Sequence, residues 1–101
     1  MAKTPEAKVK AQVTGILKAH GAYYFYPVTG GFGASGIPDI IGCINGRFFG
    51  VECKAGANKP TALQLHNMNL IRNTGGVALV VNETNIHEVE ELMQCLKQLS
   101  P

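Results

Sequence analysis

The dipeptide Asn45-Gly46, which lies between two β-rich runs, constrains the fold more than any other feature of this sequence. The runs are IPDIIGCI, residues 37–44, and RFFGVECK, residues 47–54. Asn-Gly favours the type I′ turn that joins two antiparallel strands through a two-residue loop. Because this loop length fixes the register, Ile44 is expected to face Arg47 across the hairpin.

The same register places Asp39 directly opposite Glu52, and Lys54 points to the same side as Glu52 because side chains alternate along a strand. The other positions of both runs are largely apolar, which predicts a sheet covered on both faces. Like charges that face each other across a ladder destabilise it. Two acids and a lysine in such a setting therefore indicate a functional site.

The rest of the chain predicts one α/β domain over residues 1–101. Helices are expected where N-cap residues precede apolar residues at helical spacing, and strands where short β-rich runs occur. The expected order is αβββαβα, with a mixed sheet flanked by helices on both faces and a parallel crossover through the second helix. The expected elements are a helix in 4–21, a strand in 22–28, the two strands of the hairpin, a helix in 59–76, a strand in 76–81 and a helix in 85–99, with a glycine-rich loop over 29–36.

Charge is distributed unevenly along the chain. Residues 1–82 contain eight Lys and Arg but only three acids, Glu6, Asp39 and Glu52. This basic part is compatible with a polyanionic partner such as nucleic acid. No apolar run approaches the ~20 residues that cross a bilayer, and the N-terminus has no apolar signal-peptide core, so a cytoplasmic protein without a membrane partner is expected.

Three arrangements would make the facing acids physically acceptable. One acid could be protonated, both could be in salt bridges, with Lys54 as the partner of one of them, or both could bind a cation. We favour the cation, because a single lysine does not neutralise two acids and a hard divalent ion takes oxygen ligands. Glu6 lies within the apolar stripe of the first predicted helix. Its position suits either the helix dipole or a third ligand at the same site.

These residues resemble a known signature. Pro38-Asp39, followed across the hairpin by Glu52-Cys53-Lys54, is similar to the motif of the PD-(D/E)xK nucleases. Within that superfamily the ordered set from Glu6 to Gln64 resembles the virus-type replication-repair nuclease (VRR-NUC) domain. The resemblance spans residues 6 to about 80 and implies a restriction-endonuclease-like core.

The resemblance also implies roles for individual residues. Glu6, Asp39, Glu52 and the backbone carbonyl of Cys53 would bind Mg²⁺ or Mn²⁺. Lys54 would orient or activate the attacking water, or stabilise charge on the scissile phosphate. Gln64 would help to position Lys54 or the water, although with Thr61 it also fits a helix capping box, T-x-x-Q, and both roles can coexist.

The implied activity is that of a metal-dependent, structure-selective DNA endonuclease. No base-reading motif stands out, so recognition of DNA shape through the phosphate backbone is expected. Small members of the family look like homodimers that cut four-way (Holliday) junctions in DNA repair, in a bacterial or phage-infected cell. The alternatives are a nuclease directed to flaps or nicks, and a non-catalytic DNA-binding subunit with the same fold.

Overall fold

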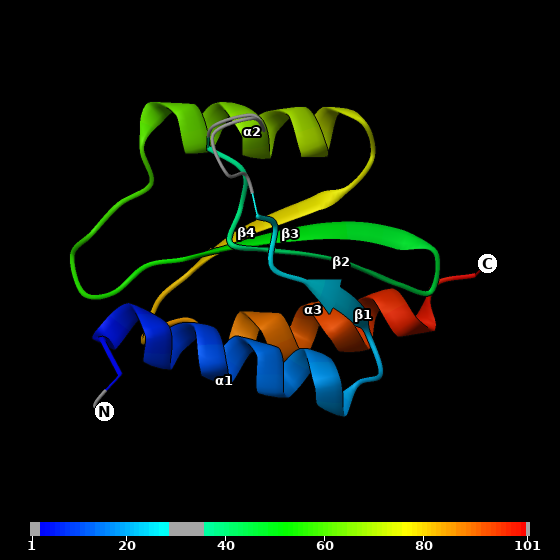
Figure 1. Ribbon diagram of the computed structural model, residues 1–101. Coiled ribbons are helices and arrows are strands. Elements are labelled where there is room, and N and C mark those ends of the chain that lie inside the picture. Colours follow the sequence, from blue (N-terminus) through cyan, green and yellow to red (C-terminus); the bar gives the residue numbers. More distant parts are fainter. Residues whose placement is uncertain (1–2, 29–35, 101) are drawn as a thin grey trace.

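The computed structural model describes residues 3–28 and 36–100, and its elements follow each other in the expected order (Figure 1). All but the last residue of the predicted glycine-rich loop, 29–36, lies outside the described residues. The elements are α1 (Pro5–Ala19), β1 (Tyr23–Phe25), β2 (Ile40–Ile44), β3 (Arg47–Cys53), α2 (Ala62–Asn73), β4 (Val77–Val81) and α3 (His87–Gln98).

The four strands form one mixed sheet in the order β1-β2-β3-β4. β1 and β3 run antiparallel to β2, whereas β4 runs parallel to β3 on its other side. Ile44 pairs with Arg47, and the ladder continues to the pair Ile40 and Val51. The register predicted from the turn is therefore confirmed.

The turn between β2 and β3 has the backbone that Asn-Gly favours. Asn45 and Gly46 both have positive φ, 51° and 75°, as a type I′ turn requires. The side-chain amide of Asn45 also donates hydrogen bonds of 2.9 Å to the carbonyl oxygens of Leu96 and Leu99. The turn is thus fixed to the C-terminal end of α3, and the Asn45 amide supplies donors to carbonyl groups at a helix end, where intrahelical partners are few.

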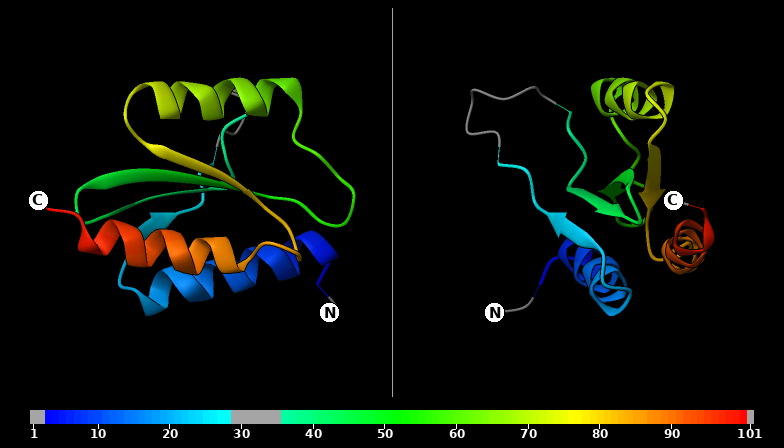
Figure 2. Two further views of the ribbon diagram at one scale, coloured as in Figure 1. Left: turned by 180° about the vertical axis from the view of Figure 1, so that it is seen from behind. Right: turned by 90° about the vertical axis from the view of Figure 1, so that its right-hand side faces the viewer.

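Helices cover both faces of the sheet, with α1 and α3 side by side on one face and α2 on the other (Figures 1 and 2). Phe49, Val51 and Cys53 of β3 are fully buried in the core that includes residues of α1 and α3. The alternate residues of β3 point toward α2, as Gly50 shows by its closeness to Ile71. A single helix covers less of the sheet than two do, and the exposed Phe48 lies on this thinner side.

α1 begins and ends where the sequence predicts. The side chain of Thr4 accepts a hydrogen bond from the amide of Ala7, and Pro5 is the first helical residue.

None of the helices in residues 3–28 and 36–100 is long and apolar enough to span a membrane.

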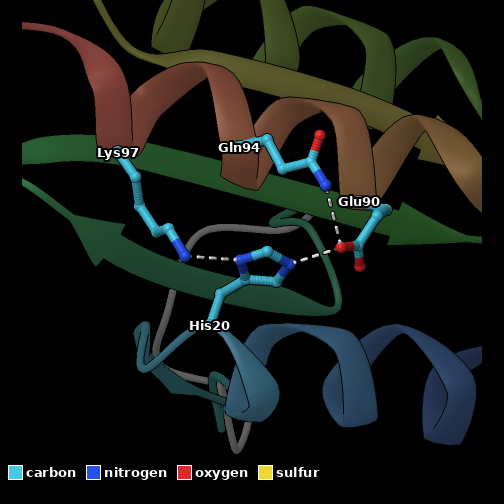
Figure 3. Close-up of polar contacts among 4 residues, drawn as sticks. All are labelled: His20, Glu90, Gln94 and Lys97. Carbon is cyan, nitrogen blue, oxygen red and sulfur yellow. Dashed lines mark hydrogen bonds and ion pairs between the residues drawn. The ribbon is translucent and has the colours of Figure 1, made fainter.

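Polar contacts join the C-terminal end of α1 to α3 (Figure 3). His20 Nε2 lies 2.7 Å from Glu90 Oε1, and Lys97 Nζ lies 3.0 Å from His20 Nδ1. Because a lysine ammonium group only donates, Nδ1 accepts and Nε2 carries the hydrogen that Glu90 receives. Gln94 donates to the same oxygen of Glu90 at 3.3 Å. These contacts help to hold α1 in place along the sheet.

Candidate active site

The two acids of the hairpin lie together at its open end, away from the turn. Asp39 immediately precedes β2, and Glu52 is the next-to-last residue of β3. Asp39 Oδ2 accepts a hydrogen bond of 2.9 Å from the backbone amide of Cys53. This bond continues the antiparallel pairing beyond the last paired residues, and it holds the Asp39 carboxylate against the end of β3.

Glu52 is almost completely buried, with 2% of its side chain exposed. One carboxylate oxygen, Oε2, lies 3.2 Å from Lys54 Nζ. The other oxygen, Oε1, is buried and accepts no hydrogen bond from the described residues. An unpaired buried oxygen on a charged group is costly, so this atom is the strongest indication that the site is built to bind something.

The environment of Glu52 disfavours its charge. Burial raises the pKa of its carboxyl group, and the nearby charge of Asp39 raises it further, while the hydrogen bond and the charge of Lys54 act in the opposite direction. The raised pKa shows that Lys54 offsets only part of the cost of burying two neighbouring acids. A cation between the carboxylates would remove that cost without a proton.

Cys53 contributes its backbone to the site, while its side chain is part of the core. Within a strand the N–H and C=O of one residue point the same way, so the carbonyl of Cys53 faces the side on which its amide meets Asp39. Burial raises the pKa of the Cys53 thiol to about 12, and the charges of Asp39, Glu52 and Glu6 raise it as well, while Lys10 lowers it. Glu6 and Lys10 of α1 are therefore within electrostatic reach of this end of β3.

Glu6 is not gathered into a tight cluster with the other two acids. It lies half-buried in the first turn of α1. Among residues 3–28 and 36–100, no three side chains of Asp, Glu, His or Cys are close enough together to hold one ion. The structure brings together Asp39, Glu52, Lys54 and the backbone of Cys53, and leaves Glu6 near them.

Gln64 forms the predicted capping box at the start of α2. Its side-chain oxygen accepts a hydrogen bond of 2.9 Å from the amide of Thr61, and the hydroxyl of Thr61 accepts one of 3.1 Å from the amide of Gln64. No hydrogen bond between Gln64 and Lys54 occurs in the described part of the chain. The interpretation of Gln64 as a helix cap is confirmed, and its catalytic role stays a prediction.

Two further features near the site were not predicted from the sequence. Lys10 lies 5.5 Å from the centre of the Tyr26 ring. The only signal for Lys10 was its position one turn after Glu6 in the same helix. In addition, Glu83 accepts hydrogen bonds of 2.9 Å and 3.2 Å from the amide of Gly56, which fixes the turn that follows Lys54. No sequence pattern linked these two distant residues.

Comparison with known structures supports the fold assignment. A solved structure described as a VRR_NUC domain matches this chain with a TM-score of 0.71 and 24% sequence identity, covering 91% of this chain and 97% of that one. No protein-family model matches the sequence, and no curated protein matches it. The chain therefore has the fold of a VRR-NUC domain, and the predicted αβββαβα, restriction-endonuclease-like core is confirmed.

Proposed function

We propose that this protein is a metal-dependent endonuclease that hydrolyses phosphodiester bonds in DNA and selects its substrate by shape. The observation that carries the proposal is the buried Oε1 of Glu52, which lies beside Asp39 and Lys54 and has no hydrogen-bond partner among the described residues. The likeness in fold to a solved VRR_NUC domain supports it. The sequence order of Asp39, Glu52 and Lys54, which resembles the PD-(D/E)xK motif, supports it as well.

The residues present suit a hard divalent cation, Mg²⁺ or Mn²⁺. Two carboxylates and a backbone carbonyl offer oxygen ligands, and Glu52 Oε1 has no partner within the described residues. We propose Asp39, Glu52 and the carbonyl of Cys53 as direct ligands, with Glu6 acting at the same site from α1. When bound, such an ion supplies positive charge that offsets the repulsion between a phosphodiester and its nucleophile and lowers the pKa of water.

Lys54 is proposed to act on the substrate. Its side chain is held by Glu52 at 3.2 Å, and 14% of it is exposed, so the side chain has a fixed position with some access to solvent. There it can donate hydrogen bonds to a phosphate oxygen or to the attacking water. Gln64 would assist through the NH₂ group of its amide, because its oxygen serves the helix cap.

The proposed substrate is branched DNA, with a four-way junction as the preferred form and flaps or nicked duplexes as the alternative. The basic first 82 residues favour a phosphate backbone, and the sequence carries no evident base-reading motif. A homodimer is proposed because two symmetric cuts in a junction need two active sites, and this chain presents one candidate site within its described residues. Its place of action would be the cytoplasm of a bacterial or phage-infected cell.

The test is a cleavage assay on labelled junction, flap, nicked and linear DNA, with Mg²⁺, with Mn²⁺ and with a chelator. The wild-type protein should cut branched DNA only with an ion present, and Glu52→Gln should not cut. Glu91→Gln, an exposed acid of α3, serves as the matched control and should cut normally. Binding without cleavage under every ion condition would instead favour a non-catalytic DNA-binding subunit.

The oligomeric state needs a separate measurement. Sedimentation should show a dimer for the protein alone, and two chains per DNA molecule when a junction is present. A monomer that cuts linear duplex as readily as a junction would contradict the junction and dimer proposals, and it would leave the nuclease proposal intact.

A further inference from the structure

An aromatic pair lies on the face of β1 that is turned toward α1. Tyr24 and Tyr26 meet edge to face, with ring centres 6.3 Å apart and planes at 72°. Tyr24 packs partly buried against the core, whereas Tyr26 is 48% exposed. One ring thus supports the other, and Tyr26 offers a fixed aromatic surface at the edge of the protein.

A cation accompanies the exposed ring. Lys10 of α1 places its ammonium nitrogen 5.5 Å from the centre of the Tyr26 ring, which is a cation–π contact. Lys10 follows Glu6 by one helical turn, so the two residues lie on the same side of α1. The adjacent Val9 is part of the same core cluster as Cys53, which ties this stretch of α1 to the end of β3.

The pair of Lys10 and Tyr26 lies at the same end of the sheet as the candidate active site. β1 is antiparallel to β2, and its last paired residue, Phe25, faces Ile41. The chain direction therefore carries Tyr26 one step further toward Asp39, which lies just before β2. The electrostatic influence of Lys10 on Cys53 agrees with this placement.

We propose that Tyr26 and Lys10 form a binding subsite for an unpaired nucleotide of the DNA strand that enters the active site. The base would stack on the Tyr26 ring, and the neighbouring phosphate would pair with the Lys10 ammonium group. Bases within a duplex are stacked on both sides, so only a splayed nucleotide can make this contact. The subsite would therefore make the enzyme prefer forks and branch points over linear duplex.

The inference rests on the proposed function in taking DNA as the ligand. A second copy of this chain is a less suitable occupant, because a two-fold interface would bring the same patch of each subunit together. Where the two-fold axis passes through the patch, the lysine of one copy would lie near the lysine of the other. Like charges oppose such a contact, whereas DNA phosphates complement it.

The absence of tryptophan from the sequence allows a direct test. Tyr26→Trp keeps an aromatic ring and the cation–π contact, and it introduces a single fluorophore whose emission reports base stacking. Tyr23→Trp provides the matched control, because Tyr23 is 64% exposed on the opposite face of β1. Each variant is titrated with a fork carrying an unpaired arm and with a linear duplex of equal length, in a chelator so that no DNA is cut.

The expected result is that the fork quenches the tryptophan emission of the Tyr26→Trp variant and that the duplex quenches it much more weakly. The emission of the Tyr23→Trp variant should respond little to either DNA. Binding is followed in parallel by the anisotropy of labelled DNA. A fork that binds without changing the emission of Tyr26→Trp, or a duplex that quenches this variant equally, would overturn the inference.

A second pair of variants tests the affinity itself. Tyr26→Leu should lower the affinity for the fork at least about fivefold, as expected for one lost stacking contact, and Tyr26→Phe should retain it. Affinity for linear duplex should change by less than about twofold in both, because backbone contacts remain. Equal losses on fork and duplex would overturn the inference. A change from dimer to monomer in Tyr26→Leu would also overturn it, by showing a subunit interface.

These measurements need no catalysis. If the protein proves unable to cut DNA while the Tyr26→Trp fluorophore still reports the unpaired arm, the subsite stands and the nuclease proposal fails. If cleavage is observed and that fluorophore does not respond, the nuclease proposal stands and the subsite is wrong.

Discussion

The substitution of Asp39 by asparagine separates two opposing effects at the candidate site. In the wild type, Asp39 Oδ2 accepts a hydrogen bond of 2.9 Å from the backbone amide of Cys53. The side-chain oxygen of the asparagine can still accept this bond. Asp39→Asn removes the negative charge that helps to raise the pKa of Glu52. The ion pair of Glu52 with Lys54, at 3.2 Å, is left in place.

The size of the effect follows from the pairing geometry. Directly opposed residues have Cβ atoms roughly 5 Å apart, which suggests a carboxylate separation of roughly 6 Å. Two unit charges at about 6 Å repel by about 2.8 kcal/mol at an effective dielectric constant of about 20, and by about 0.7 kcal/mol in bulk water. Replacing a charged acceptor by a neutral one costs about 1 kcal/mol. The free energy of unfolding of Asp39→Asn should therefore equal that of the wild type or exceed it by up to about 2 kcal/mol.

Asp39→Ala is the informative companion. It removes the same charge and also leaves the Cys53 amide without its acceptor, which costs about 1–3 kcal/mol in a buried setting. Urea denaturation in a chelator should thus rank Asp39→Asn above Asp39→Ala. Titration with Mn²⁺ should show that both variants bind the ion more weakly than the wild type.

Two results would refute this reasoning. If Asp39→Asn lowers the free energy of unfolding by more than about 1 kcal/mol, repulsion between the two acids does not contribute significantly to the stability of the wild type. Unchanged Mn²⁺ affinity in that variant would show that Asp39 is not a ligand.

Three further predictions concern other residues. Because the pKa of Glu52 is raised in the folded state, its contribution to stability is present below the ordinary value of 4.5 and is lost as pH rises through the folded-state value. Urea titrations in a chelator should therefore show that the stability of the wild type relative to Glu52→Gln falls as pH increases from about 4 to about 8. Lys54→Ala should bind branched DNA but cut it at least about 10²-fold more slowly, while the distant control variant Lys97→Ala should cut normally. A Lys54→Ala protein with normal cleavage and a lower melting temperature would show that the salt bridge is purely structural. Asn45→Gly keeps the turn but loses two hydrogen bonds to the end of α3, so its free energy of unfolding should be about 1–3 kcal/mol lower than that of the wild type. An unchanged urea midpoint would contradict this.

The hairpin was predictable because it depends on local rules. The turn chemistry of Asn45-Gly46 sets the loop length, and the alternation of side chains then fixes which residues face each other. The caps of α1 and α2 followed from residues within one turn of each helix start. Each of these features is decided by neighbours in the sequence.

Features that depend on long-range packing were not predictable to the same degree. The β-rich run 22–28 pairs only over Tyr23–Phe25, because the length of an edge strand is set by its single partner. The contact between Lys10 and Tyr26 joins a helix to the segment after a strand, and no sequence pattern links them. Glu52 Oε1 has no hydrogen-bond partner among the described residues. Whether this buried oxygen is paired depends on every element around it, so only the structure could reveal its lack of a partner.

The pairing of Asp39 with the end of β3 also restricts how this hairpin can change during evolution. Adding one residue within β2 or β3 would place Asp39 opposite a neighbour of Glu52, and the two carboxylates would then leave opposite faces of the sheet. Adding two would restore the shared face. A longer turn need not change this pairing. Proteins that keep this site should therefore vary the strand segments between each acid and the turn by even numbers of residues, except where a β-bulge absorbs one.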